Sequence, residues 1–329
     1  MSEFLPQAGM IPNVATFDGT FKTKEFTPMA HITVVGSTAL DTIETPFGRV
    51  EEIPGGSALF ISAAASLFAT VHLVGVVGND FPLEKIAFFR ERGVDFDGLE
   101  VVRGPTFRWE GFYHRDMNRR DTISVDLGVF ENFDPHLPPS AAEAGYLMLA
   151  NIDPALQQRV LDQSHSPRLV ALDSMNHWIT GSRSLLESLL ERVDLFLLND
   201  EELTLLTDES SLLAGAEKLL SKGLKYVVVK KGEHGSTTVS RDGFTFLCPA
   251  YPLSGPKDPT GAGDTFAGAL IGYLAATDDL GPFNIRRAIV YGTVAASFAV
   301  EDFGLARLMT LTNDELQKRF RRFQAMVEF

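Results

Sequence analysis

The stretch Asp258-Pro259-Thr260-Gly261-Ala262-Gly263-Asp264-Thr265-Phe266-Ala267-Gly268 places two carboxylates around a Gly-Ala-Gly turn, directly before an apolar, helix-like run. Small residues let the backbone approach a ligand closely, and the first amides of a helix have no partners inside it. Such a turn can therefore bind an anion, for example phosphoryl oxygens. Asp264 is expected beside that anion, where a carboxylate is costly unless a metal or a reaction uses it. The pattern indicates phosphoryl transfer with Mg²⁺, and a plain helix N-cap is the structural alternative.

The chain on either side of this stretch alternates between β-rich apolar runs and helical patterns. The predicted strands are residues 31–36, 71–77, 146–150, 168–173, 193–198 and 226–230. The predicted helices are residues 57–69, 82–92, 154–164, 182–191, 211–222, 265–276, 284–300 and 313–327, the last with a capping box at Thr312 and Glu315. This alternation predicts a largely parallel sheet flanked by helices. A tight turn at 241–243 predicts a hairpin and an antiparallel edge.

The complete stretch 258–268 resembles the C-terminal signature of the ribokinase-like (PfkB) carbohydrate kinases, usually written D-T-x-G-A-G-D-x-F, with Pro259 where Thr is frequent. The resemblance implies an α/β fold with a mostly parallel central sheet, helices on both faces and a small β-sheet lid. It also implies ATP and Mg²⁺ as cofactors. The predicted catalytic residues are Asp264 as general base and, through their amides, Gly261, Ala262 and Gly263. No G-x-x-x-x-G-K-[ST] motif occurs, so these amides must cradle the phosphates.

A second glycine turn, Gly55-Gly56, precedes the predicted helix 57–69 and resembles the first signature of the same family. The resemblance implies that these glycines contact substrate hydroxyls. Asp41 matches the aspartate that binds the sugar diol, because its two oxygens can accept from adjacent hydroxyls. A turn residue at a strand end is the alternative for Asp41. The family frequently has Asn shortly after the glycine pair, where this chain has Leu59 and Phe60.

Two further segments resemble the family's metal and nucleotide motifs. Asn199-Asp200-Glu201-Glu202 matches N-x-x-E, which assigns Asn199 and Glu202 to the Mg²⁺ and phosphate network, since Mg²⁺ prefers hard oxygen ligands. A capped helix start is the structural alternative there. Lys230-Lys231-Gly232-Glu233-His234-Gly235 resembles the G-x-x-G nucleotide loop. The predicted nucleotide-binding residues are Asn199, Lys231, Gly232, Gly235 and Asp258.

Two segments, 41–53 and 101–129, read as strands without intervening helices. By resemblance they form the lid over the sugar site, and Arg108, Trp109 and Phe112 within it are candidates for recognising a nucleobase, a sugar or a sugar phosphate. The predicted domains are an N-terminal arm at 1–30 and a ribokinase-like kinase domain at 31–329. A lid sheet with an exposed edge can pair with a second copy, so a homodimer through the lid is a further expectation.

Composition limits the possible classes of protein. The 329 residues are 45% hydrophobic, which allows a large core. A net charge of −14 disfavours nucleic acid and anionic membranes as partners. No apolar run reaches the roughly 18 residues of a membrane span, and residues 1–30 do not read as a secretory signal. The single Cys248 agrees with a reducing compartment, so we expect a cytoplasmic protein.

The sequence therefore favours an ATP-dependent phosphotransferase that acts on a hydroxyl of a sugar or sugar-like small molecule. The first alternative is a nucleoside kinase of the adenosine or cytidine type, favoured if Phe60 and the lid aromatics stack on a base. The second is a non-catalytic ligand-binding protein of the same fold. A dinucleotide-binding oxidoreductase is disfavoured because no G-x-G-x-x-G follows an early strand. The family often builds a monovalent-cation loop where this chain has 291–304, which adds such a cation to the expectations.

Overall fold

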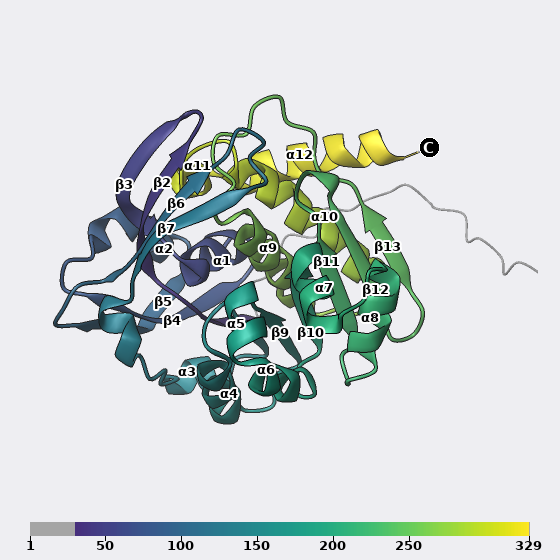
Figure 1. The fold of residues 1–329 in the computed structure, drawn as a ribbon, viewed down its shortest axis with the longest axis horizontal. Coiled ribbons are helices and arrows are strands. Elements are labelled where there is room, and N and C mark those ends of the chain that lie inside the picture. The colour runs from purple at the N-terminus through teal and green to yellow at the C-terminus, as the bar shows by residue number, and fades with distance from the viewer. Residues whose placement is uncertain (1–29, 329) are drawn as a thin grey trace, which may run out of the picture.

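A computed structural model describes residues 30–328, and these residues contain two β-sheets with helices on both faces of the larger one (Figure 1). Nine strands form the larger sheet in the order β13-β12-β11-β10-β9-β8-β1-β4-β5. Their bounds are β1 His31–Val35, β4 Thr70–Gly78, β5 Val94–Val102, β8 Tyr146–Leu149, β9 Leu169–Asp173, β10 Leu195–Asn199, β11 Tyr226–Lys230, β12 Ser236–Ser240 and β13 Thr245–Cys248. Neighbouring strands run parallel from β11 to β5, whereas β12 and β13 add an antiparallel edge. The predicted mixed α/β sheet is confirmed.

Alternate residues of the buried strands point to opposite faces of this sheet, so the strands are apolar on both sides. In β8, Tyr146 and Met148 join one core cluster, while Leu147 and Leu149 join the other. The first core is covered by α1 Ser57–Ala65, α2 Phe88–Glu91, α9 Ala262–Thr277, α10 Pro282–Ala299, α11 Ala306–Thr310 and α12 Asn313–Val327. The second is covered by α3 Pro139–Ala142, α4 Pro154–Gln163, α5 Asn176–Gly181, α6 Arg183–Leu190, α7 Asp200–Thr207 and α8 Leu212–Leu220. None of the helices in residues 30–328 is long and apolar enough to cross a membrane.

A second, four-stranded sheet has the order β3-β2-β6-β7 and stands beside the β4–β5 end of the large sheet (Figure 1). Its strands are β2 Ala39–Thr45, β3 Gly48–Gly55, β6 Phe107–Tyr113 and β7 Arg120–Asp126. The small sheet expected from the sequence is therefore present. Its boundaries differ from 41–53 and 101–129, because Val101 and Val102 end β5 in the large sheet, paired with β4, and residues 128–132 form a 3₁₀ turn.

Most predicted helices lie within a few residues of their expected bounds, with one clear exception. The predicted helix 82–92 is a 3₁₀ turn at Leu83–Ile86 followed by the short α2, because Gly93 (φ 77°) ends the segment and β5 begins at once. Helices α3, α5, α7 and α11 were not among the predictions. The predicted arm at 1–30 lies outside the described residues except for its last position.

Strand order explains where a ligand site can form. β1 lies between β4 and β8, so the chain winds outward in opposite directions on its two sides. In an open α/β sheet, a ligand crevice forms at the carboxyl ends of the strands where this reversal occurs. The carboxyl ends of β9, β10 and β11 carry Asp173, Asn199 and Lys230. The sheet therefore brings three polar residues from distant parts of the sequence to one edge.

Candidate functional site

The Gly-Ala-Gly turn forms the N-terminus of α9, as its sequence predicts. Gly261 is the N-cap and adopts the left-handed conformation (φ 72°), which glycine tolerates best. A Cβ at this position would also lie 2.3 Å from the ring of Phe60, which is 1% exposed. Phe60 thus packs behind the turn and is too deeply buried to stack on a substrate base. Residues 258–263, the anion loop, therefore have the Phe60 ring packed behind them.

Asp264 lies in the first turn of α9, where the free amides of the helix N-terminus are nearest. Burial, together with the negative charge of Asp173, raises the pKa of its carboxyl to about 6 against the opposing charges of Lys230 and Arg120. A base with this pKa is mostly ionised at neutral pH, yet it holds a proton more readily than an ordinary aspartate. Asp264 is therefore suited to accept a proton from an alcohol.

A buried ion pair joins the ends of two strands beside the anion loop. The Nζ of Lys230 lies 2.8 Å from Oδ2 of Asp173. Burial would lower the pKa of Lys230, but the nearby carboxylates of Asp173 and Glu202 outweigh it and raise the pKa. A Cβ on Gly263 would lie 3.3 Å from the Lys230 Nζ, so this ammonium is next to the loop. The sequence predicts a nucleotide contact for the neighbouring Lys231. The sequence feature that marks Lys230 is its position as the last residue of a buried strand.

Asn199 and Glu202 form a capping box at the start of α7, the structural alternative for this motif. The Asn199 Oδ1 accepts from the Glu202 amide at 2.7 Å, and the Glu202 Oε2 accepts from the Asn199 amide at 2.8 Å. Burial raises the pKa of Glu202 to about 7, opposed by the charge of Lys230. Among residues 30–328, no group of three or more His, Cys, Asp or Glu side chains could hold a metal by itself. These oxygens suit a Mg²⁺ that keeps its waters and is held mainly by phosphates.

Asp41 faces the second glycine turn, at the point where β2 meets the end of β3. A Cβ on Gly55 would lie 1.9 Å from its Oδ2, and Gly56 adopts a φ of 94°. Burial raises the pKa of Asp41 to about 7, opposed by the hydrogen bond from the Gly56 amide and reinforced by the negative charges of Asp258 and Asp264. The structure thus brings Asp41, Gly55 and Gly56 together and places Asp41 within electrostatic range of Asp264.

Asp258 fastens the anion loop to a neighbouring loop. The side chain is fully buried; its Oδ1 accepts from the Thr260 amide at 2.8 Å and its Oδ2 from the Gly304 amide at 2.9 Å. Burial raises its pKa despite these bonds. Asp258, predicted in the nucleotide site, is therefore placed to shape the loop from behind.

A cavity of about 660 Å³ opens on one side of the anion loop, within the range of small-molecule sites. It is lined by the loop residues Ala262 and Gly263, by Gly232 and Gly235, and by the segment 250–256. Lys230 lines it as well, whereas Lys231, Asp258 and Asp264 do not. Asp41 does not line the cavity either, so the glycine turn borders the cavity while the carboxylates of Asp41 and Asp264 lie outside its wall.

The small sheet and the connection between β6 and β7 contact both the anion loop and the segment 232–235. The Thr260 Oγ1 donates to the Tyr113 Oη at 3.1 Å, and the Asn118 Nδ2 donates to the Glu233 Oε1 at 2.9 Å. Arg108, a candidate for substrate recognition, is held at 2.8 Å by both Glu52 and Asp80. Its charge is therefore already compensated within the protein.

The fold is a parallel α/β sheet with a small second sheet beside it, and one helix N-terminus carries both the anion loop and a carboxylate. These features define the class of phosphoryl-transferring enzymes that bind their donor through a glycine turn. The chain belongs to the pfkB family of carbohydrate kinases, whose family model matches residues 29–311. It is a kinase that transfers a phosphoryl group to a sugar or a nucleoside. The expected family and enzyme class are confirmed.

The proteins similar to this chain include kinases named for a nucleoside and kinases named for a sugar. A cytidine kinase of Thermococcus kodakarensis is 30% identical over 254 residues, which cover 75% of this chain and 88% of the relative. The nucleoside kinase of Methanocaldococcus jannaschii has a similar fold, with a TM-score of 0.71 at 22% identity over 90% of this chain and 99% of that one. A putative ribokinase II from E. coli, solved with ATP and Mg²⁺, has a TM-score of 0.71 at 22% identity over 89% of this chain and 100% of that one.

Proposed function

We propose that this chain transfers the γ-phosphoryl group of ATP to a hydroxyl of a nucleoside or sugar, with Asp264 as the general base. One observation carries the proposal. The glycine turn that caps α9 borders the 660 Å³ cavity, and the carboxylate of Asp264 in the first turn of α9, with Asp41 within its electrostatic range, lies outside the cavity wall. ATP in the cavity would present its terminal phosphate to the turn, where an acceptor hydroxyl held by Asp41 can meet it.

In this mechanism the acceptor hydroxyl attacks the γ-phosphorus as its bond to the β,γ-bridging oxygen breaks. The hydroxyl proton passes to the Asp264 carboxylate, and ADP leaves. The amides of residues 261–263 and the ammonium of Lys230 stabilise charge on the phosphoryl oxygens. Asn199 and Glu202 would hold a hydrated Mg²⁺ through its waters, and the ion would neutralise phosphate charge. Gly232 and Gly235 line the nucleotide side.

The acceptor is the part of the proposal on which the two leading alternatives differ. Asp41 and the Gly55-Gly56 turn suit the vicinal hydroxyls of ribose, free or within a nucleoside. Similarity to a cytidine kinase favours the nucleoside. Since Phe60 is buried behind the anion loop, a base would be met by the partly exposed Trp109 of β6. Trp109 lies on the same strand face as Tyr113, whereas Phe112 lies on the opposite face. We propose that the four-stranded sheet is the lid that covers this acceptor, with residues 39–55 and 107–126 as its parts.

Two further features belong to the proposal. The edge strand β7 is exposed throughout, with Ile123 at 59% and Val125 at 54%, which would suit pairing of two lids in a homodimer. Sedimentation of the purified protein tests that state.

A monovalent cation at 291–304 would make the rate depend on K⁺ against Na⁺ at constant ionic strength.

ADP release from Mg²⁺-ATP, measured with a panel of acceptors, tests the function. The panel contains cytidine, adenosine, ribose, fructose, fructose 6-phosphate and myo-inositol. At least one pentose-containing compound should raise the rate well above the acceptor-free rate, and cytidine above ribose would select the nucleoside kinase. A chain that binds ATP while no acceptor raises the rate would support the non-catalytic alternative. The matched control is Asp264→Asn, which removes the proposed base.

A further inference from the structure

The arginines of the small sheet differ in how their charge is compensated. Arg49 forms ion pairs with Glu44, Glu51 and Glu110 at 2.9–3.0 Å. Arg108 is held by two carboxylates, as described above. Arg120, the first residue of β7, is exposed and forms no ion pair with any carboxylate in residues 30–328. In a chain with a net charge of −14, a cation without an ion-pair partner beside the active site requires an explanation.

Strand pairing fixes where Arg120 lies. It is the register partner of Tyr113 across β6 and β7; burial raises the pKa of the Tyr113 hydroxyl, and the positive charge of Arg120 opposes this rise. That hydroxyl accepts from the Thr260 Oγ1 at 3.1 Å, and Thr260 directly precedes Gly261. On its other side, the guanidinium carbon is 5.2 Å from the centroid of the Trp109 ring, a cation–π contact that orients the group. Arg120 thus lies across the strand pair from the tyrosine that accepts a hydrogen bond from the anion loop.

The surroundings of Arg120 are acidic but do not bind it directly. Its charge lowers the pKa values of Asp41, Glu202 and Asp264, carboxyls that come from three different elements. The other cation among them, Lys230, is already paired with Asp173 at 2.8 Å. A guanidinium that faces several carboxylates at a distance, while its nearest contacts are neutral, keeps its donors available for a phosphate.

We propose that Arg120 binds the phosphoryl group during its transfer, so that the small sheet supplies a positive charge as well as a cover. The inference rests on the proposed function. The planar fork of a guanidinium matches two phosphoryl oxygens, and its charge counters the charge that spreads over them as the bond to ADP loosens. The Gly261–Gly263 amides would act on the group from α9, and Arg120 from the second sheet.

The test compares Arg120→Ala and Arg120→Lys with Arg119→Ala. Arg119 is the adjacent exposed arginine, and its backbone forms two hydrogen bonds: its carbonyl accepts from the His114 amide and its amide donates to the Asp116 Oδ1 at 3.1 Å. With the best acceptor, Arg120→Ala should lose about 100-fold or more in kcat while the acceptor KM changes less than about threefold. Arg120→Lys should recover part of the loss, because it restores charge without the fork. Arg119→Ala should stay within about twofold of the wild type.

Nucleotide binding gives a second readout that needs no acceptor. Arg120→Ala should weaken binding of the non-hydrolysable ATP analogue AMP-PNP, with Mg²⁺, about tenfold while binding of ADP changes less than about twofold, because only the former carries the γ-position. Equal affinities for AMP-PNP in variant and wild type, together with unchanged kcat, would overturn the inference while the proposed function stands. A wild-type chain that binds neither nucleotide would overturn the proposed function as well.

Discussion

Asp264 shares its surroundings with two carboxylates, Asp41 and Asp173, and two cations, Lys230 and Arg120. Replacing it with Asn keeps the shape of the side chain and removes the proposed base. The kcat should fall about 10²–10⁴-fold, the range expected for a positioned general base. Thermal stability and ADP affinity should be retained, since burial already disfavours the charged form of this group. Melting curves with and without ADP, run beside the kinetic assay, check both; near-normal turnover would reject the assignment.

The raised pKa of Asp264 predicts an acid limb in the pH–rate profile. The base acts in its ionised form, so activity is present above the pKa and is lost as the pH falls through about 6. Below that point kcat/KM should drop about tenfold per pH unit. An aspartate with an ordinary pKa would place the limb near 4. Rates measured between pH 5 and 8, with saturating Mg²⁺, decide between these values, and a flat profile across pH 6 would contradict the role.

At the residue scale, the sequence identified the groups that lie within one motif and missed those that only the fold assembles. Gly261 and Asp264 are three positions apart, so local spacing reveals them. Tyr113 and Arg120 come from the second sheet, and nothing near them in the sequence marks them as neighbours of the anion loop, whereas Lys230 ends a buried strand and begins the predicted nucleotide loop.

At the scale of elements, the connection between β6 and β7 reaches the nucleotide loop. Asn118 donates to Glu233 across this gap at 2.9 Å, and both residues line the cavity. Breaking the bond should raise the KM for ATP a few-fold while the acceptor KM changes less, because the contact spans the nucleotide side. Asn118→Ala, Glu233→Ala and the double variant form a cycle with an expected coupling of about 0.5–1.5 kcal/mol in ATP binding.

A control for this cycle is Ser124→Ala in β7, whose hydroxyl donates to Glu110 at 3.2 Å and which does not line the cavity. Its ATP affinity should match the wild type. Additive effects of the two single variants would show that the contact contributes nothing to nucleotide binding, and that the small sheet acts on the acceptor alone.

Elements were predictable where periodicity and a capping signal agreed. α12 was expected at 313–327 and begins after the Thr312–Glu315 capping box, with both reciprocal hydrogen bonds formed. α9 begins at Ala262, three residues before its predicted start, because Gly261 in the left-handed conformation can cap a helix that Gly263 then continues. β5 was not predicted as a strand and its last two residues were assigned to the lid, since its pairing with β4 in the large sheet is a long-range contact that alternation alone does not reveal.

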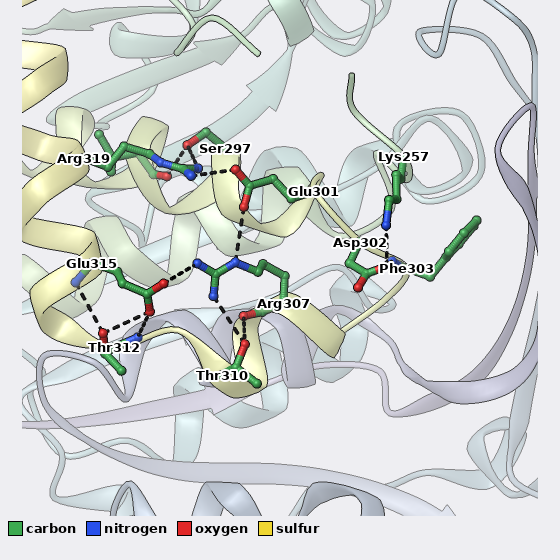
Figure 2. A network of polar contacts seen from close by, with 11 residues as sticks. Lys257, Ser297, Glu301, Asp302, Phe303, Arg307, Thr310, Thr312, Glu315 and Arg319 are labelled. Carbon is green, nitrogen blue, oxygen red and sulfur yellow. Dashed lines mark hydrogen bonds and ion pairs between the residues drawn. The ribbon is translucent and has the colours of Figure 1, made fainter. Parts of the chain in front are cut away.

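At the scale of the whole molecule, a polar network ties the C-terminal helices to the loop behind the active site (Figure 2). Glu301 accepts from the Arg307 Nε at 3.2 Å and from the Arg319 Nη2 at 2.6 Å. Arg319 also donates to the Ser297 Oγ at 3.0 Å. Glu301 follows Val300, whose carbonyl accepts from the Lys257 amide at 2.7 Å, next to the buried Asp258. Glu301 therefore connects α12 to the chain that supports the anion loop.

Glu301→Ala should lower the free energy of unfolding by about 1–3 kcal/mol, because two partly buried guanidiniums lose their shared acceptor and face each other. The matched control is Asp314→Ala, which breaks the ion pair with Lys318 within α12. The Asp314 and Lys318 side chains are 70–75% exposed, against 29% for Glu301, so the control should lose about 0.5 kcal/mol or less of unfolding free energy. Urea unfolding at 25 °C measures both. Equal losses would mean that the apolar side chains of α12, not the network, hold this helix against the core.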